Sequence, residues 1–300
     1  MNNTKIWISA FRLRTLPLAL ASIAMGGFLA LSAGFFRWSI FLLCVSTTIF
    51  LQILSNLAND YGDSIHGADS IDRKGPSRAV QSGAISSGSM KIAMIVFILL
   101  SLISGISLLL ISFGVNWGAI LFFLGLGVLS ILAALAYTVG RKPYGYLGLG
   151  DFSVLIFFGL VGVMGSYYLF TKQISQLQIL PALSCGLFSI GVLNINNIRD
   201  IESDKKAGKF SIPVRIGKKK ATLYHWFLIF SGWTAALFYT VLTYESPWQF
   251  LFVLSLPLFI KNGITVSKKE SHELDPYLKQ MALSTLLFVI LFGVGQNIHY

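Results

Sequence analysis

Long apolar segments and short polar ones alternate along the whole chain. Each apolar segment has roughly the 20 residues that a helix needs to cross the hydrocarbon core of a bilayer. The pattern therefore predicts an all-α, polytopic membrane protein with about nine transmembrane helices. The expected spans are 17–34, 38–58, 91–112, 117–137, 150–170, 178–196, 222–243, 248–266 and 281–298.

The composition indicates one membrane domain. The 300 residues are 55% hydrophobic and 12% charged, with a mean hydropathy of +0.72, whereas a soluble domain carries about 25% charged residues. Cys44 and Cys185 both lie inside apolar segments, which is typical of packing residues and gives no support for a disulfide framework. No Pro/Gly/Ser-rich linker interrupts the chain. We expect a single integral membrane domain over residues 1–300.

The basic residues predict the orientation of the chain. Of the 23 Lys and Arg residues, all but Arg37 and Lys172 fall on the side that the amino terminus would occupy. Because Lys and Arg are retained on the cytoplasmic side, we expect the amino terminus and the long loops after the second and sixth spans in the cytoplasm. The net charge of +11 is distributed at membrane ends, which favours anionic lipid and an anionic substrate and argues against nucleic acid as a partner.

Two clusters of Asn and Asp residues follow apolar segments on that side. Asn59 and Asp63 are four residues apart and share a helix face, and the second cluster repeats this spacing 137 residues later. Oxygen donors without His or Cys suit Mg²⁺ rather than zinc. Helix-end residues of this kind often only cap a helix, but two matched clusters in a chain with 12 acids favour a metal site. The first acid cluster is Asn59, Asp60 and Asp63, and the second acid cluster is Asn196, Asp200 and Asp204.

The same spacing suggests a weak internal duplication, in which spans one to four are echoed by spans five to eight and the ninth is appended. Cations follow each acid cluster and also occupy the loop after the fourth span. Arg and Lys at such positions can bind phosphate oxygens, although each loop alone is also typical of a positive-inside anchor. The cations singled out are Arg73, Arg78, Arg141, Lys142 and Lys209.

Three long motifs resemble a known family. They are LQILSNLANDYGD at 51–63, YTVGRKPYGYLGLGD at 137–151 and LNINNIRD at 193–200. With these motifs the chain resembles the UbiA superfamily of intramembrane prenyltransferases, and within it the bacterial menaquinone branch. The likeness extends from Arg14 over nearly the whole chain. The broader family often has a further Asp where this chain has Gly67, so Asp60, Asp69 and Asp72 all stay open as the acid that completes the first metal shell.

The resemblance implies a function and a location. Nine helices would surround a central cavity that opens laterally to lipid, in the bacterial plasma (inner) membrane. The enzyme would transfer a polyprenyl group from polyprenyl diphosphate to 1,4-dihydroxy-2-naphthoate, with loss of CO₂ and diphosphate, giving demethylmenaquinol. The implied roles are Mg²⁺ binding for Asn59, Asp63, Asn196, Asp200 and Asp204, diphosphate binding for Arg73, Arg78 and Lys209, and catalysis for Asp60, Tyr137, Arg141 and Lys142.

Three other functions stay open at the level of the residues. The acceptor could be 4-hydroxybenzoate or another aromatic ring, because no motif defines the acceptor pocket. A secondary transporter would also contain intramembrane acids, but it would place them near the midplane, whereas these acids lie at span ends beside basic loops. A structural membrane scaffold would leave the paired acids unexplained.

Overall fold

The computed structural model describes residues 3–66 and 78–298. Within these ranges nine helical segments are long and apolar enough to cross a membrane and no strand occurs, which confirms the predicted all-α architecture. The elements are α1 (Asn3–Phe11), η1 (Leu13–Thr15), α2 (Leu16–Ser32), α3 (Trp38–Ile65), α4 (Ser87–Phe113), α5 (Trp117–Ala136), α6 (Gly150–Val154), η2 (Leu155–Gly165), α7 (Ser166–Thr171), η3 (Gln176–Gln178), α8 (Ile179–Arg199), α9 (Ile201–Lys206), α10 (Ile212–Leu242), η4 (Pro247–Ser255), α11 (Leu256–Lys268), η5 (Ser271–Glu273) and α12 (Asp275–Gln296).

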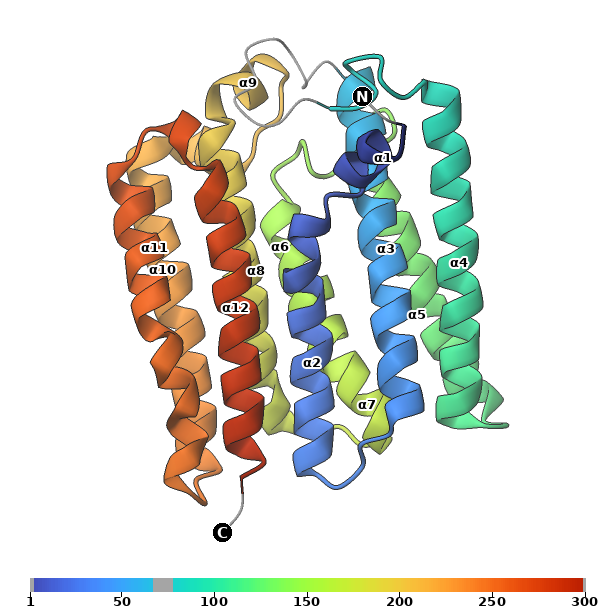
Figure 1. Ribbon diagram of the computed structural model, residues 1–300, viewed down its shortest axis with the longest axis vertical. Coiled ribbons are helices and arrows are strands. Elements are labelled where there is room, and N and C mark those ends of the chain that lie inside the picture. Colours follow the sequence, from blue (N-terminus) through green and yellow to red (C-terminus); the bar gives the residue numbers. More distant parts are fainter. Residues whose placement is uncertain (1–2, 67–77, 299–300) are drawn as a thin grey trace.

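The two ends of the described chain lie at opposite ends of the bundle, as an odd number of spans requires (Figure 1). α1 and α9 are both at the end of the bundle where the chain starts. We call it the amino-terminal end of the bundle. α12 packs against α2 and α8, so the last span contacts the first. α3 packs against α4, and the fifth span, formed by α6, η2 and α7, packs through η2 against α2 and α8.

Several helices extend past the apolar segments that predicted them, and they do so at the amino-terminal end of the bundle. α3 continues to Ile65 instead of ending at 58, and α12 begins at Asp275 instead of 281. α10 begins at Ile212 instead of 222, with a break at Gly217, whose φ is 77°. A helix satisfies its own backbone hydrogen bonds, so it can continue into the polar region beyond the bilayer. The internal duplication stays a prediction.

Small residues bring the fifth and sixth spans together. Gly159 in the π-helix η2 lies so near α8 that a Cβ atom there would be 2.8 Å from the Ala182 carbonyl oxygen and 3.2 Å from the Gly186 Cα. Helices in a bilayer associate largely through such close backbone contacts. The contact fixes α8, which ends in the second acid cluster, against a helix that lines the central cavity.

Candidate active site

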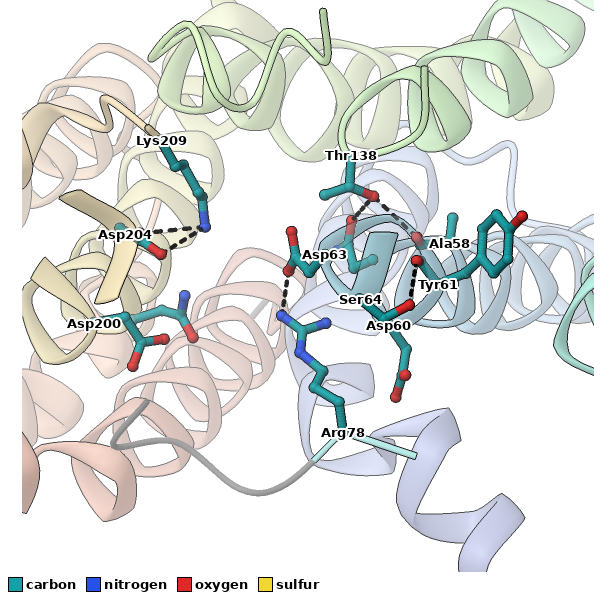
Figure 2. Close-up of polar contacts among 12 residues, drawn as sticks. Ala58, Asp60, Tyr61, Asp63, Ser64, Arg78, Thr138, Asp200, Asp204 and Lys209 are labelled. Atoms are coloured by element: carbon teal, nitrogen blue, oxygen red, sulfur yellow. Dashed lines mark hydrogen bonds and ion pairs between the residues drawn. The ribbon is translucent and has the colours of Figure 1, made fainter. Parts of the chain in front are cut away.

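The first acid cluster lies in the last two turns of α3. Because the helix continues to Ile65, Asn59 and Asp63 share one face, as predicted. The Asp63 carboxylate is buried and forms an ion pair with Arg78 (Figure 2). It also accepts a hydrogen bond of 2.9 Å from the Tyr146 hydroxyl. Burial and the negative charge of Asp63 raise the pKa of Tyr146, so its hydroxyl stays protonated and donates to this carboxylate.

Asp60 points away from Asp63 and has another role (Figure 2). Its two carboxylate oxygens accept hydrogen bonds of 3.0 Å from the backbone N–H groups of Ala79 and Val80. These are the two residues that follow Arg78, so Asp60 holds the backbone from which Arg78 reaches Asp63. The geometry gives no support to the catalytic role expected for Asp60, because both of its oxygens accept hydrogen bonds from the loop backbone.

The loop after α5 is fitted closely to α3. Thr138 donates a hydrogen bond of 3.0 Å to the carbonyl oxygen of Ala58 and one of 3.2 Å to the side-chain oxygen of Asn59. Gly62 permits this approach, since a Cβ atom there would lie 2.5 Å from the Thr138 carbonyl oxygen. The Thr138 contact thus fixes the orientation of the Asn59 amide within the first acid cluster.

The second acid cluster does not lie on one continuous helix. α8 ends at Arg199, and Asp200 adopts φ −101° and ψ 13° before α9 begins at Ile201. The backbone N–H groups of Asp200 and Asp204 still donate to the carbonyl oxygens of Asn196 and Asp200, at 3.2 and 2.8 Å, so the predicted spacing of four residues is kept across an irregular residue. The break turns Asp204 toward Lys209, whose Nζ lies 3.3 Å from Asp204 Oδ2 (Figure 2).

Burial and nearby charges act in opposite directions on the pKa values of Asp204 and Lys209. Loss of solvent raises the pKa of Asp204 to about 6, against the opposing effect of Lys209. Burial alone would lower the pKa of Lys209, but Asp204 and Asp63 outweigh it and leave that pKa above its ordinary value. Lys209 therefore stays charged between the two acid clusters. This cation is a binding group for a polyanion that reaches the same space.

Asp200 is held by its neighbour in sequence. Arg199 Nε lies 2.9 Å from Asp200 Oδ1, and Arg199 Nη2 lies 2.6 Å from Asp200 Oδ2. The same Nη2 donates a hydrogen bond of 2.8 Å to the Asn196 side-chain oxygen. Arg199 also pairs with Asp275 at the start of α12, and Asp275 in turn pairs with Arg14.

A cavity of about 1160 Å³ joins the acid clusters to the interior of the bundle. From its polar end it continues along apolar side chains of α2, α3, α5 and η2 to Gln178 at the opposite end. Phe122 of α5 lines it and is 64% exposed, so the wall formed by α5 borders the outside of the bundle. The charged and polar residues at the polar end include Arg12, Asn59, Asp63, Arg78, Tyr137, Asn196 and Lys209, whereas Asp200 and Asp204 lie behind this lining.

Of the remaining residues predicted for the site, only one lines the cavity in the part of the chain that the structure describes. Arg73, Asp69 and Asp72 lie outside the described residues. Arg141 and Lys142 are exposed and do not line the cavity, so their expected catalytic role has no support in this geometry. Tyr137 does line it, and loss of solvent raises the pKa of its hydroxyl to about 12.

Four residues that contact the acid clusters, directly or through Arg199, or line the polar end of the cavity were not predicted from the sequence. They are Arg12, Tyr146, Arg199 and Asp275. Tyr146 belongs to a motif that was noticed, and Arg199 directly precedes a predicted ligand, so both gave a local signal. Arg12 lines the polar end of the cavity with a left-handed φ of 49°, and Asp275 reaches the second acid cluster only through the fold. Neither is visible in the sequence pattern.

The donor set fits Mg²⁺ bound together with a phosphate ligand. In the part of the chain that the structure describes, no three His, Cys, Asp or Glu side chains form a ready-made metal cluster. However, Mg²⁺ keeps several waters and often binds through one or two carboxylates plus substrate phosphates. Asp63 and Asp204 supply buried carboxylates, and among the described residues Oδ2 of Asp204 has only the ion pair with Lys209 at 3.3 Å. These oxygens suit a metal that a diphosphate brings.

Comparisons with known proteins identify the family and relatives of this chain. The chain matches the UbiA prenyltransferase family over residues 19–289. It is 48% identical to the 1,4-dihydroxy-2-naphthoate octaprenyltransferase of Haemophilus influenzae, over 97% of this chain and 95% of that one. The enzyme of the same name from Escherichia coli is 42% identical, over 98% of this chain and 96% of that one.

Solved structures share the fold. A UbiA homologue from Aeropyrum pernix superposes with a TM-score of 0.68 at 20% identity, covering 95% of this chain and 97% of that one. A UbiA homologue from Archaeoglobus fulgidus, bound to GPP and Mg²⁺, has a TM-score of 0.62 at 16% identity, covering 96% of this chain and all of that one. At these identities the likeness concerns the arrangement of the helices.

Proposed function

The chain belongs to the UbiA prenyltransferase family, and we propose that it transfers a polyprenyl group from polyprenyl diphosphate to 1,4-dihydroxy-2-naphthoate. The transfer releases diphosphate and CO₂ and gives demethylmenaquinol. The observation that carries this proposal is the cavity, which joins a cluster of acids and cations to a long apolar channel. A polyprenyl diphosphate has the same two parts, a polyanionic head and a hydrocarbon tail. The relatives at 48% and 42% identity are 1,4-dihydroxy-2-naphthoate octaprenyltransferases, which supports this acceptor.

The cations of the site bind the departing diphosphate. Arg78 and Lys209 are each paired with an acid here, and a diphosphate offers both an alternative anion. As the allylic C–O bond breaks, its electron pair leaves with the diphosphate, and fixed positive charge stabilises that developing anion most effectively where water is excluded. Mg²⁺ held by Asn59, Asp63, Asn196, Asp200 and Asp204 would supply further positive charge at the same oxygens. Arg73, outside the described residues, stays a proposed diphosphate ligand.

The apolar wall of the cavity keeps water away from the reacting allylic carbon. The naphthoate ring attacks the allylic carbon, forms the new C–C bond and loses its carboxyl group as CO₂. Tyr137 lines the cavity between the two acid clusters and the apolar channel, and its protonated hydroxyl donates a hydrogen bond to the bound diphosphate. The apolar side chains beyond it bind the tail, which enters sideways past the exposed Phe122.

We further propose that the protein is one integral domain of the bacterial inner membrane, with the amino-terminal end of the bundle in the cytoplasm. The basic residues support this orientation, because most of them follow spans that end on that side. Water-soluble 1,4-dihydroxy-2-naphthoate would then reach the acid clusters from the cytoplasm, and the lipid would supply the donor.

The test is an assay of the purified protein in lipid vesicles with a polyprenyl diphosphate and either 1,4-dihydroxy-2-naphthoate or 4-hydroxybenzoate. We expect prenylated naphthoate and an equal amount of CO₂, only when Mg²⁺ is present. Asp63→Asn should remove this activity, whereas Ser64→Ala, the adjacent residue on α3, should keep it. Prenylated product from 4-hydroxybenzoate alone would contradict 1,4-dihydroxy-2-naphthoate as the acceptor. No prenylated product from either ring would contradict prenyl transfer itself.

A further inference from the structure

A chain of four alternating charges connects the last transmembrane helix to the second acid cluster. Arg14, Asp275, Arg199 and Asp200 follow one another in space, although they come from the start of the first span, the start of the ninth, the end of the sixth and the break that follows it. Arg14 Nη1 lies 2.7 Å from Asp275 Oδ2, and Arg199 pairs with the other oxygen of Asp275. Asp275 therefore bridges two guanidinium groups.

Arg199 is the buried centre of this chain. Its side chain is 1% exposed and that of Asp200 is 4% exposed, so neither charge is solvated and each depends on its partners. Four hydrogen bonds leave the one guanidinium group, two to Asp200, one to Asn196 and one to Asp275. A planar group bound on three sides cannot rotate, and it fixes the orientation of both Asn196 and Asp200.

We propose that Arg199, held in place by Asp275, is a positioning residue that orients Asp200 and Asn196 toward the metal and the diphosphate. The proposal rests on the Mg²⁺-dependent prenyl transfer proposed above. Carboxylates that bind metals are usually oriented by further hydrogen bonds, and removal of such a partner weakens metal affinity about 10- to 100-fold. A carboxylate oxygen that accepts one hydrogen bond retains a second lone pair for a metal, so the Arg199 contact and metal binding are compatible.

Asp275 gives the sharper variant, because its side chain is 30% exposed and lies outside the acid clusters. Asp275→Asn retains the size of the side chain but turns an N–H₂ group toward one of the two arginines. Mn²⁺ binding to the purified protein, with inorganic diphosphate present, can be followed by electron paramagnetic resonance. We expect Asp275→Asn to weaken Mn²⁺ binding and to raise the Mg²⁺ concentration at half-maximal activity, each about 10-fold or more, while kcat at saturating Mg²⁺ stays within about threefold.

Two further variants separate positioning from general stability. Arg199→Lys keeps the charge but loses the planar fork, so it should reproduce the weakened Mn²⁺ binding; Asp275→Asn added to it should have no further effect, because Asp275 acts through Arg199. Lys205→Gln removes an exposed charge from the neighbouring helix α9 and should bind Mn²⁺ like the wild type.

Normal Mn²⁺ binding by Asp275→Asn, or effects of Arg199→Lys and Asp275→Asn that simply add, would overturn the proposal. This result differs from a failure of the proposed function. If the wild type formed no prenylated product while the Mn²⁺ affinities changed as expected, the role of Arg199 would stand and the reaction would be wrong.

Discussion

Asp60→Asn should detach the segment that presents Arg78 while leaving the acid that faces the cavity in place. In the structure both oxygens of Asp60 accept 3.0 Å hydrogen bonds from the N–H groups of Ala79 and Val80. An amide at position 60 has one acceptor, so its N–H₂ group faces one of these donors and leaves that donor buried without a partner. Hydrogen bonds to a charged group contribute about 1.5–3 kcal/mol, and a loss of about 2 kcal/mol corresponds to roughly 30-fold in the docking equilibrium.

The direct measurement is hydrogen exchange at the two amides. If the free energy that holds the loop on Asp60 falls by about 2 kcal/mol, hydrogen exchange at the Ala79 and Val80 amides should become about 30-fold faster. KM for the polyprenyl diphosphate should rise as well, because Arg78 is no longer held beside the cavity. Ser64→Ala is the matched control, since it removes a 2.7 Å hydrogen bond to the Tyr61 carbonyl oxygen within the same helical turn, and Ser64 has no hydrogen bond to residues 78–86 of the loop. Unchanged exchange at both amides in Asp60→Asn would refute the anchoring role.

Three other substitutions test the site. Tyr146→Phe removes the hydrogen bond to the charged Asp63 carboxylate, and at about 2 kcal/mol it should raise KM for the donor roughly 30-fold; an unchanged KM would show that this bond does not contribute to donor binding. The pKa of Tyr137 is raised to about 12, so the hydroxyl is protonated throughout pH 7–9, and Tyr137→Phe should lower kcat by the same factor across that range. A ratio that changes with pH would indicate ionisation instead. Gly62→Ala introduces a Cβ atom 2.5 Å from the Thr138 carbonyl oxygen and should lower the melting temperature through about 1–3 kcal/mol of overpacking, whereas Gly88→Ala, whose nearest neighbour would lie 3.9 Å away, should not.

The number and order of the spans could be predicted because apolar length alone determines them. Helix ends at the amino-terminal end of the bundle could not, because α3 and α12 extend into polar sequence where hydropathy no longer marks a helix. The shared face of Asn59 and Asp63 was predicted correctly, since only helical spacing decides it. The break at Asp200 was missed because no Gly or Pro stands there to mark it.

The roles of single charged residues were harder to predict than their membership of the site. Asp60 and Asp63 are both acids on one helix end, and only the tertiary structure shows that one binds backbone amides and the other a guanidinium. Arg141 and Lys142 have the composition of a phosphate site but are exposed. Asp275 is separated from Arg199 by 76 residues, so no local pattern could connect them.

The ribosome delivers the spans from first to last, so Asp275 emerges only with the final one. Until α12 is inserted, Arg14 and Arg199 lack the carboxylate that bridges them, so in a nascent or truncated chain Arg199 keeps only Asp200 as its acid partner. Such an intermediate is less stable than the finished bundle and exposes a charge imbalance that quality-control proteases can act on. The second acid cluster therefore reaches its final arrangement only after the ninth span is inserted.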